Sequence, residues 1–142
     1  MSAVNYKTLE LPKGYAPKKT EQYMCVQQRA YFYGLLNAQR AGLQAEIDAF
    51  VASIKESVES GNIGANSDDD KSAIEQTIME QSRMQNRALQ MIAQIDAALE
   101  RLSNGSFGYS VISGDEIGLK RLMVRPTTTM TMEERENYEN KV

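Results

Sequence analysis

The chain has 142 residues, of which 42% are apolar and 25% charged, so its length and composition suit one compact domain or one domain with an extended arm. Its net charge of −3 and pI of about 5.1 argue against direct binding to nucleic acid phosphates, and we expect no direct sequence-specific DNA binding. A single cysteine, Cys25, and no histidine exclude an internal disulfide framework and a cysteine-rich metal site, and they leave no nucleophile–base pair, so we expect no enzyme.

Residues 1–21 are predicted to form an irregular arm. Pro12 and Pro17 each bias the preceding residue toward extended backbone. The segment lacks the apolar core of a signal peptide, and no apolar run in the chain approaches the roughly 18 residues that span a membrane. We therefore expect a cytoplasmic protein with no membrane partner.

A long helix is predicted from about residue 22 to residue 60. Apolar residues recur there at alternating three- and four-residue steps, with Arg40 filling one gap, which is the pattern of a heptad seam. The apolar seam positions are Leu36, Leu43, Ile47, Phe50 and Ile54. One face of this helix is therefore expected to pack against a second helix.

That second helix is predicted from about residue 68 to residue 102, after the turn-forming stretch SGNIGANSDDD at 60–70. Its seam comprises Ile74, Ile78, Gln81, Gln85, Ala88, Ile92, Ile95, Leu99 and Leu102. We interpret the two glutamines as a polar layer that sets register at a cost in stability, rather than as catalytic residues. The two seams predict an antiparallel helical hairpin with arms roughly 50 Å long.

The last forty residues are predicted to form a small globular domain. Short strands are expected at 109–112 and 119–124 around a turn at 114–118, and Thr131 with Glu134 forms a capping box that predicts a C-terminal helix. The expected apolar core of this domain is Phe107, Tyr109, Val111, Ile112, Ile117, Leu119, Leu122, Val124, Met130 and Met132.

The predicted fold class is mainly α. The arm of 1–21 is expected to pack near the globular end, residues 22–103 to form a long antiparallel coiled-coil hairpin with its tip at about 60–72, and residues 104–142 to form the globular domain and its helix. We expect a monomer.

Two stretches of the chain combine into a distinctive pattern, namely EQYM (21–24) before the first helix and a run of spaced residues in the globular domain: Gly108, Tyr109, Gly114, Ile117, Gly118, Arg121, Leu122, Arg125 and Pro126. This pattern is similar to that of the DksA/TraR family of bacterial transcription factors. The resemblance covers about residues 20–138. It implies that the globular domain resembles a zinc ribbon.

The four positions at which the family places zinc-binding cysteines hold other residues here. They fall on Ser110, Ser113, Thr131 and Glu134. Structural zinc sites use four thiolate, imidazole or carboxylate ligands. We therefore expect a zinc-independent member without a cofactor, whose domain is held by apolar packing and by the Thr131–Glu134 capping box.

The resemblance implies that the partner is RNA polymerase. Family members insert the hairpin into the polymerase secondary channel, where acidic tip residues act near the active site and destabilise promoter complexes, repressing ribosomal RNA promoters and activating others. Of the family's two tip aspartates, the second aligns with Asp70 and the first with Ser67, while Ser72 takes the place of an alanine. Asp68 and Asp69 lie beside the lost aspartate and are candidates to replace it. Helix capping is the competing interpretation of this acidic cluster.

The resemblance also implies contacts at the rim of the polymerase channel. The positions that meet the alarmone ppGpp in the family are Met91, Gln94, Arg125 and Arg135, and Arg87 is a candidate contact to the polymerase rim. Gln94 replaces a lysine, which weakens one phosphate contact. The competing interpretation of these arginines is ordinary surface charge.

A second hypothesis follows from the altered tip. The hairpin would act as a passive adaptor or competitor that occupies the polymerase channel, or another groove, without acting on promoters.

Overall fold

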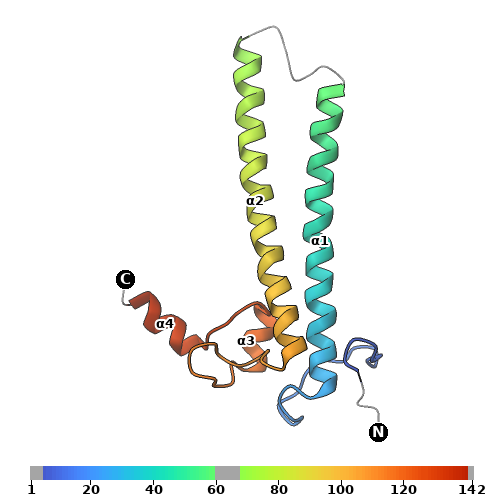
Figure 1. Cartoon of the computed structure of the whole chain (residues 1–142), viewed down its shortest axis with the longest axis vertical. Helices are drawn as coiled ribbons and strands as arrows, with labels where there is room; N and C mark the ends of the chain where they lie inside the picture. The colour runs from blue at the N-terminus through green and yellow to red at the C-terminus, as the bar shows by residue number, and fades with distance from the viewer. Residues whose placement is uncertain (1–4, 60–67, 141–142) are drawn as a thin grey trace. The chain divides into compact units, whose positions relative to one another are not determined.

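The structure is a computed structural model, which describes residues 5–59 and 68–140. Four helices follow in chain order: α1 (Val26–Glu59), α2 (Asp68–Asn104), α3 (Leu119–Val124) and α4 (Met132–Asn140) (Figure 1). The described residues contain no strand, only an isolated antiparallel bridge between Tyr109 and Glu116. The predicted mainly α fold class is confirmed. Of the predicted turn at 60–70, residues 60–67, which include Ser67, lie outside the described residues, and Asp68–Asp70 belong to α2.

Contacts divide the chain into two compact units. We call Gln39–Ala93 the hairpin unit, and Met1–Ala38 together with Gln94–Val142 the finger unit. Both long helices contribute to both units, because the division cuts α1 and α2 part-way along.

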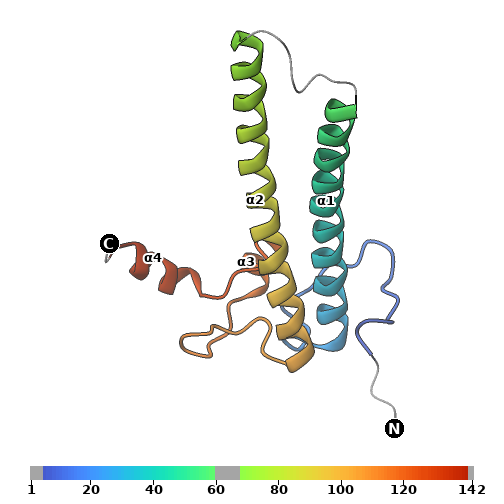
Figure 2. The ribbon, with the colours of Figure 1, turned by 45° about the horizontal axis from the view of Figure 1, so that its top comes forward.

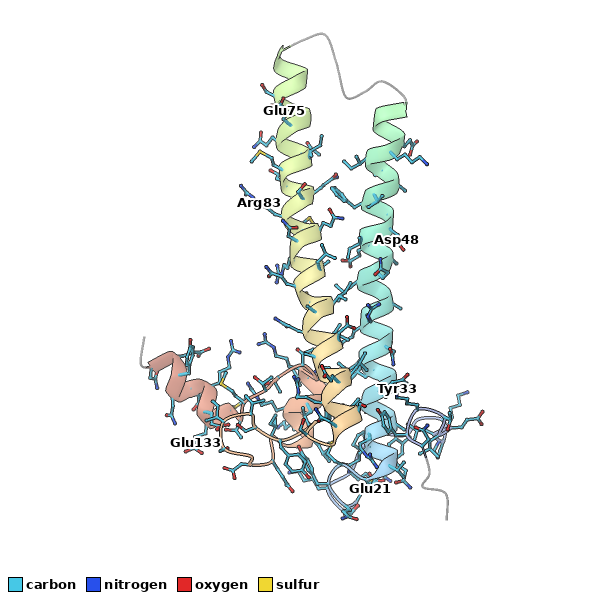
Figure 3. The ribbon with its side chains drawn as sticks, viewed as in Figure 1. Glu21, Tyr33, Asp48, Glu75, Arg83 and Glu133 are labelled. Atoms are coloured by element: carbon cyan, nitrogen blue, oxygen red, sulfur yellow. The ribbon has the colours of Figure 1, made fainter. Side chains whose placement is uncertain are left out.

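The hairpin unit consists of the last part of α1 and the first part of α2, which run antiparallel side by side (Figure 1). Ile47, Ala88 and Ile92 are buried between them, with Leu43 packed against this cluster. These are seam positions, so the heptad pattern is confirmed there. Charged side chains such as Asp48, Glu75 and Arg83 are exposed and point away from the facing helix (Figure 3).

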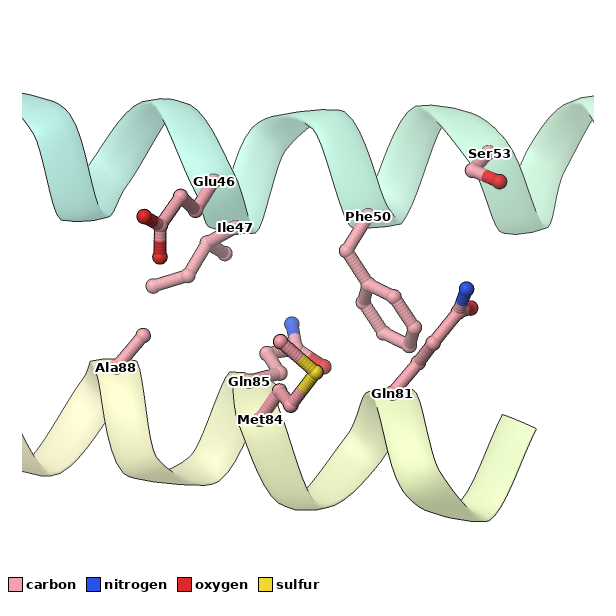
Figure 4. A pocket seen from close by; sticks show the side chains of 8 residues that line it. All are labelled: Glu46, Ile47, Phe50, Ser53, Gln81, Met84, Gln85 and Ala88. Carbon is pink, nitrogen blue, oxygen red and sulfur yellow. The ribbon is translucent and has the colours of Figure 1, made fainter. Parts of the chain in front are cut away.

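A cavity of about 240 Å³ interrupts the packing of the hairpin unit. Gln81 and Gln85 reach into it from α2, opposite Phe50 of α1 (Figure 4). Both glutamines are half-buried, as expected for seam positions. The predicted polar layer therefore borders this cavity.

The finger unit has its own apolar core. It brings together both long helices and the C-terminal segments, and its most deeply buried apolar side chains are Phe32, Leu36, Ile95, Leu102 and Leu122. Phe107 is also buried and packs against Phe32, with the two ring centroids 5.4 Å apart. In both ribbon views the arm lies on the α1 side of this unit, and α3 and α4 lie on the α2 side (Figures 1 and 2).

Aromatic and polar contacts attach the arm to the start of α1. Tyr6 packs edge-on against Tyr33, with ring centroids 5.5 Å apart. The Tyr15 hydroxyl lies 2.9 Å from each carboxylate oxygen of Glu21, whose Oε1 also accepts the Lys18 amide at 2.9 Å.

Helix α1 begins at Val26, four residues later than the predicted start at about residue 22. Met24 adopts a left-handed backbone conformation with φ of 55°, which is incompatible with a continuous α-helix. The buried side chain of Gln28 accepts the Met24 amide at 2.8 Å and donates to the Lys18 carbonyl at 3.2 Å. The side chain of Gln28 thus caps the start of α1, and the helix does not extend back to the predicted start at about residue 22.

The predicted strand at 119–124 is wrong, because these residues form helix α3. Gly118, with φ of 103°, turns the chain immediately before it, and the Leu122 amide donates to the Gly118 carbonyl at 3.2 Å. Leu119 and Leu122 are both buried, and their three-residue spacing fits one face of a helix. Of the predicted strand 109–112, only Tyr109 takes part in a bridge.

Four residues of the predicted globular core are exposed, so the core prediction is wrong for them: Val111, Ile112, Val124 and Met132. Val111 and Ile112 face outward because Ser110 turns inward and its Oγ accepts the amides of Ile112 and Ser113 at 3.1 and 3.3 Å. Val124 ends α3 on the face opposite its buried leucines and is 83% exposed.

The predicted capping box is confirmed. The Thr131 amide donates to Glu134 Oε1 at 2.9 Å, and the Glu134 amide donates to Thr131 Oγ1 at 3.1 Å. Helix α4 begins at the next residue, Met132. Within residues 5–59 and 68–140, no helix combines the length and the apolar character needed to cross a membrane.

Candidate functional site

The acidic tip residues Asp68, Asp69 and Asp70 form the first turn of α2. Acidic side chains are favoured at this position because the helix macrodipole is positive at the N-terminus. Only the backbone of these three residues is described, whereas Ser72, one turn further on, is exposed. The order of the chain therefore places three carboxylates at the start of one helix.

The predicted rim residues on α2 are all exposed. Arg87 and Met91 lie in the hairpin unit, and Gln94 lies at the start of the finger unit's part of α2. Met91 is 43% exposed although its neighbour Ile92 is buried in the seam. These side chains are therefore accessible to a partner.

Arg125 and Arg135 occupy different elements of the finger unit. Arg125 follows the last residue of α3 and is exposed, and its amide donates to the Arg121 carbonyl at 2.8 Å. Arg135 lies in α4 and forms an ion pair with Glu139 at 3.1 Å. That pair joins exposed side chains four residues apart, a class of contact that contributes little stability and can be exchanged for another partner.

Arg125 also borders a groove of about 540 Å³ in the finger unit. Its apolar lining residues include Ile117 and Leu119, and its cationic lining residues are Lys19, Lys120, Arg121 and Arg125. None of its lining residues in the described part of the chain is acidic. A groove lined by cationic and apolar residues favours anions.

The four positions that align with the family's zinc ligands come together in the finger unit. The loop of Ser110–Ser113 lies beside the start of α4, because the Val111 amide donates to the Thr129 carbonyl at 3.0 Å. The pKa of the Glu134 carboxyl is lowered to about 2 by the polar groups beside it, first the Ser110 side chain and then the Thr131 amide, which donates to Glu134 Oε1 at 2.9 Å. Hydrogen bonds that favour the ionised form have this effect on a carboxyl group.

These residues do not fit a structural zinc ion. Zinc prefers thiolate and imidazole ligands in a closed tetrahedral shell, and here three of the four positions offer neutral hydroxyls. The one carboxylate, Glu134, already accepts the Thr131 amide. Among the side chains that the structure describes, no group of three or more His, Cys, Asp or Glu is arranged to hold a metal ion.

Sequence reasoning did not identify the role of Tyr23. Its hydroxyl donates to the Gly108 carbonyl at 2.6 Å and accepts the Gly118 amide at 3.1 Å, so one side chain before α1 joins both ends of the segment 108–118. Gly108 has φ of 90°, and a Cβ there would lie 3.0 Å from Met24 Cγ, so a larger residue has neither the conformation nor the space. The match of EQYM to the family is the sequence signal that marks Tyr23.

Comparison with known proteins identifies close relatives. The chain is 32% identical over 127 residues to the RNA polymerase-binding transcription factor DksA of Caulobacter vibrioides, covering 89% of this chain and 87% of the relative. It is 31% identical over 121 residues to the protein of the same name from Escherichia coli K12, covering 84% of this chain and 76% of that protein.

A solved structure also matches the fold. The transcription factor DksA2 from Pseudomonas aeruginosa aligns with a TM-score of 0.75 at 33% sequence identity, covering 84% of this chain and 88% of that one. No family model matches the chain. The identity to the named relatives nevertheless extends over most of both sequences. The chain therefore belongs to the DksA/TraR family.

Proposed function

We propose that this chain binds RNA polymerase and regulates transcription from within the polymerase secondary channel. The observation that carries the proposal is the similarity to RNA polymerase-binding transcription factors over 84–89% of the chain. In this proposal the start of α2 reaches the region of the active site, where its carboxylates destabilise promoter complexes, including those at ribosomal RNA promoters. Asp70 is the residue that carries this effect, with Asp68 and Asp69 beside it.

The proposed action of Asp70 is electrostatic. Three carboxylates in one helical turn carry three negative charges, which exceeds what a single helix cap requires. Near a catalytic centre that handles nucleotide phosphates and cations, such charges perturb the interactions that hold an open promoter complex. Polymerase affinity, in contrast, is assigned to the exposed rim residues such as Arg87.

We further propose that ppGpp modulates this activity at the polymerase interface. The exposed guanidinium of Arg125 and the cationic groove beside it supply donors for phosphate oxygens. Arg135 can exchange its exposed ion pair with Glu139 for a phosphate contact. Met91 and Gln94 are the other two residues of the proposed ppGpp site. Because Gln94 is uncharged, we expect a weaker response to ppGpp than a lysine at this position would give.

The test is the pair of variants Asp70→Asn and Asp48→Asn. Each removes one carboxylate from the hairpin unit, but Asp48 lies on the exposed outer face of α1 (Figure 3). We expect D70N to bind polymerase within about twofold of wild type and to lose its effect on promoter-complex lifetime, while D48N retains both properties. A D70N protein that shortened the lifetime as well as wild type would refute the assignment of Asp70.

The passive competitor is the second candidate, and the tip sequence favours it. Ser67 and Ser72 replace an aspartate and an alanine of the family motif, and Ser72 is exposed. A passive hairpin would displace other channel-binding factors from polymerase yet leave the promoter-complex lifetime unchanged even in the wild-type protein. The same lifetime measurement therefore separates the two candidates.

A further inference from the structure

We propose that Met84 is an apolar anchor by which the hairpin unit docks on an acidic surface of its protein partner. The docking surface is the side of α2 that carries Met84, Arg87 and Met91, which we call the α2 flank. The inference rests on the proposed function, because it takes that partner to be RNA polymerase. It adds a residue that is not one of the family's motif positions, and it names the chemistry of the surface that this residue meets.

Met84 is the most exposed large apolar side chain described on α2. It is 72% exposed, although Ala88, one turn further along, is buried in the seam. Methionine and arginine are enriched at protein interfaces, but single exposed apolar residues occur on any protein surface. The surroundings of Met84 therefore decide whether the position belongs to an interface.

The spacing along α2 makes Met84 continuous with the proposed rim contacts. Met84, Arg87 and Met91 lie three and four residues apart, so they share one side of the helix. Arg87 and Met91 are exposed as well. The α2 flank therefore presents two thioethers with a guanidinium between them on one rigid element of the hairpin unit.

The charges around Met84 identify the kind of surface that fits. Residues 81–95 contain Arg83 and Arg87 and no acidic residue, which gives a net charge of +2 within a chain whose net charge is −3. Both arginines are exposed. Guanidinium groups around an apolar contact are complementary to carboxylates around an apolar side chain. A nucleic acid would gain from the arginines but not from Met84, so the partner surface is an acidic protein surface.

Met84 also borders the cavity of about 240 Å³ between α1 and α2 (Figure 4). Ile47, Phe50 and Ala88 supply apolar lining beside it. A methionine side chain is unbranched and adaptable, so it can repack around an incoming group. An apolar side chain of the partner that rests on Met84 is therefore received at this cavity, where its contact with water is reduced.

Met84→Ala tests the anchor, with Met79→Ala as the matched control. Met79 is also an exposed methionine of α2, but it lies five residues away on a different face of the helix. We expect M84A to weaken binding to purified RNA polymerase by about tenfold and M79A to stay within about twofold of wild type. Met84→Leu, which keeps an apolar side chain of similar volume, should stay within about threefold. Equal affinities of M84A and wild type would overturn the proposal.

Salt dependence separates the apolar contact from the charges beside it. M84A should weaken binding by the same factor at low and at high salt, whereas the effect of Arg87→Ala should shrink as the salt concentration rises. An M84A defect that disappeared at high salt would contradict an apolar anchor. A wild-type chain that did not bind polymerase at all would refute the proposed function, whereas a wild type that bound no better than M84A would refute only this inference.

Photo-crosslinking identifies the surface that Met84 meets. Met84→benzoylphenylalanine should crosslink to a polymerase segment that contains aspartate or glutamate, and Met79→benzoylphenylalanine should give no such product. A crosslink from position 84 to DNA, to a second copy of the chain, or to a polymerase segment without acidic residues would contradict the proposed partner surface.

Discussion

At the scale of single residues, the finger unit is held by polar side chains that reach backbone groups elsewhere in the chain. Gln28 is fully buried and joins the arm to the start of α1. Ser110 holds the loop that follows Tyr109, and Tyr23, which precedes α1, binds the Gly108 carbonyl and the Gly118 amide on either side of that loop. Replacing any of these side chains with an apolar one leaves its backbone partner without a hydrogen bond. A buried polar group without a partner lowers the free energy of unfolding by about 1–3 kcal/mol.

At this scale, ionisation of Glu21 should make the attachment of Tyr15 in the arm depend on pH. The Lys18 amide, together with the Tyr15 hydroxyl and Gln28, holds the pKa of this carboxyl below its ordinary value of 4.5. A carboxyl group with a lowered pKa stabilises the folded state fully above its ordinary value, and that contribution is lost as the pH falls through the folded-state pKa. We therefore expect the arm to release Tyr15 below pH 4.5, which the NMR signals of the Tyr15 ring would report.

Two variants complete this measurement. Glu21→Gln should show the released Tyr15 signals already at neutral pH and no further acid transition. Glu10→Gln, an exposed carboxylate on the same arm, should titrate like wild type. If E21Q and wild type shifted in parallel below pH 4.5, another group would be responsible.

At the scale of elements, periodicity predicted the long helices but not the short segments. The seams of α1 and α2 extend over many turns, so tertiary context could move their ends only by a few residues, as Met24 and Gln28 do. The six residues of α3 fit a strand or a helix equally well, because short apolar runs do not reveal their period. What decides between them is the turn at Gly118 and the burial of Leu119 with Leu122, and both are tertiary features.

The seam glutamines give a prediction at this scale. Gln85→Leu should stabilise the hairpin unit by about 1 kcal/mol, because it places an apolar side chain in the 240 Å³ cavity next to Phe50 and removes a half-buried amide. Thermal unfolding followed by circular dichroism would measure the gain.

The control for this variant is Gln90→Leu on the same helix, at an exposed position that should change stability by less than about 0.5 kcal/mol. A Q85L protein that unfolded at a lower temperature than wild type would mean that the amide makes a contact worth more than the apolar side chain.

At the scale of the whole molecule, charge is unevenly distributed along the chain. Residues 44–70 carry seven acidic residues and one lysine, whereas residues 117–130 carry three basic residues and no acidic one.

The spacing of the family motif was sufficient to predict which residues of the finger unit occupy the positions of the lost zinc ligands. The sequence also predicted the capping box of Thr131 and Glu134, but not that the Ser110 side chain helps to lower the pKa of Glu134, because that effect depends on how two loops pack. The roles of the tip and rim residues stay predictions.

Arg125 provides the prediction at this scale. Arg125→Ala should leave polymerase affinity nearly unchanged but raise the ppGpp concentration needed for a half-maximal effect by about tenfold, since a charge-assisted hydrogen bond is worth about 1.5–3 kcal/mol. Lys55→Ala removes the same charge from an exposed position of the hairpin unit and should have no such effect. A promoter-lifetime titration with ppGpp compares them, and equal responses would remove Arg125 from the ppGpp site.

The two hydrogen bonds of Tyr23 meet at a single oxygen atom. Displacement of that hydroxyl removes both contacts at once, so the turns at Gly108 and Gly118 are coupled through one side chain. The Ile117 amide, which donates to the Gly108 carbonyl at 2.8 Å, links the same two turns through the backbone. The segment between them should therefore open more readily when Tyr23 is displaced, and its two ends should loosen together.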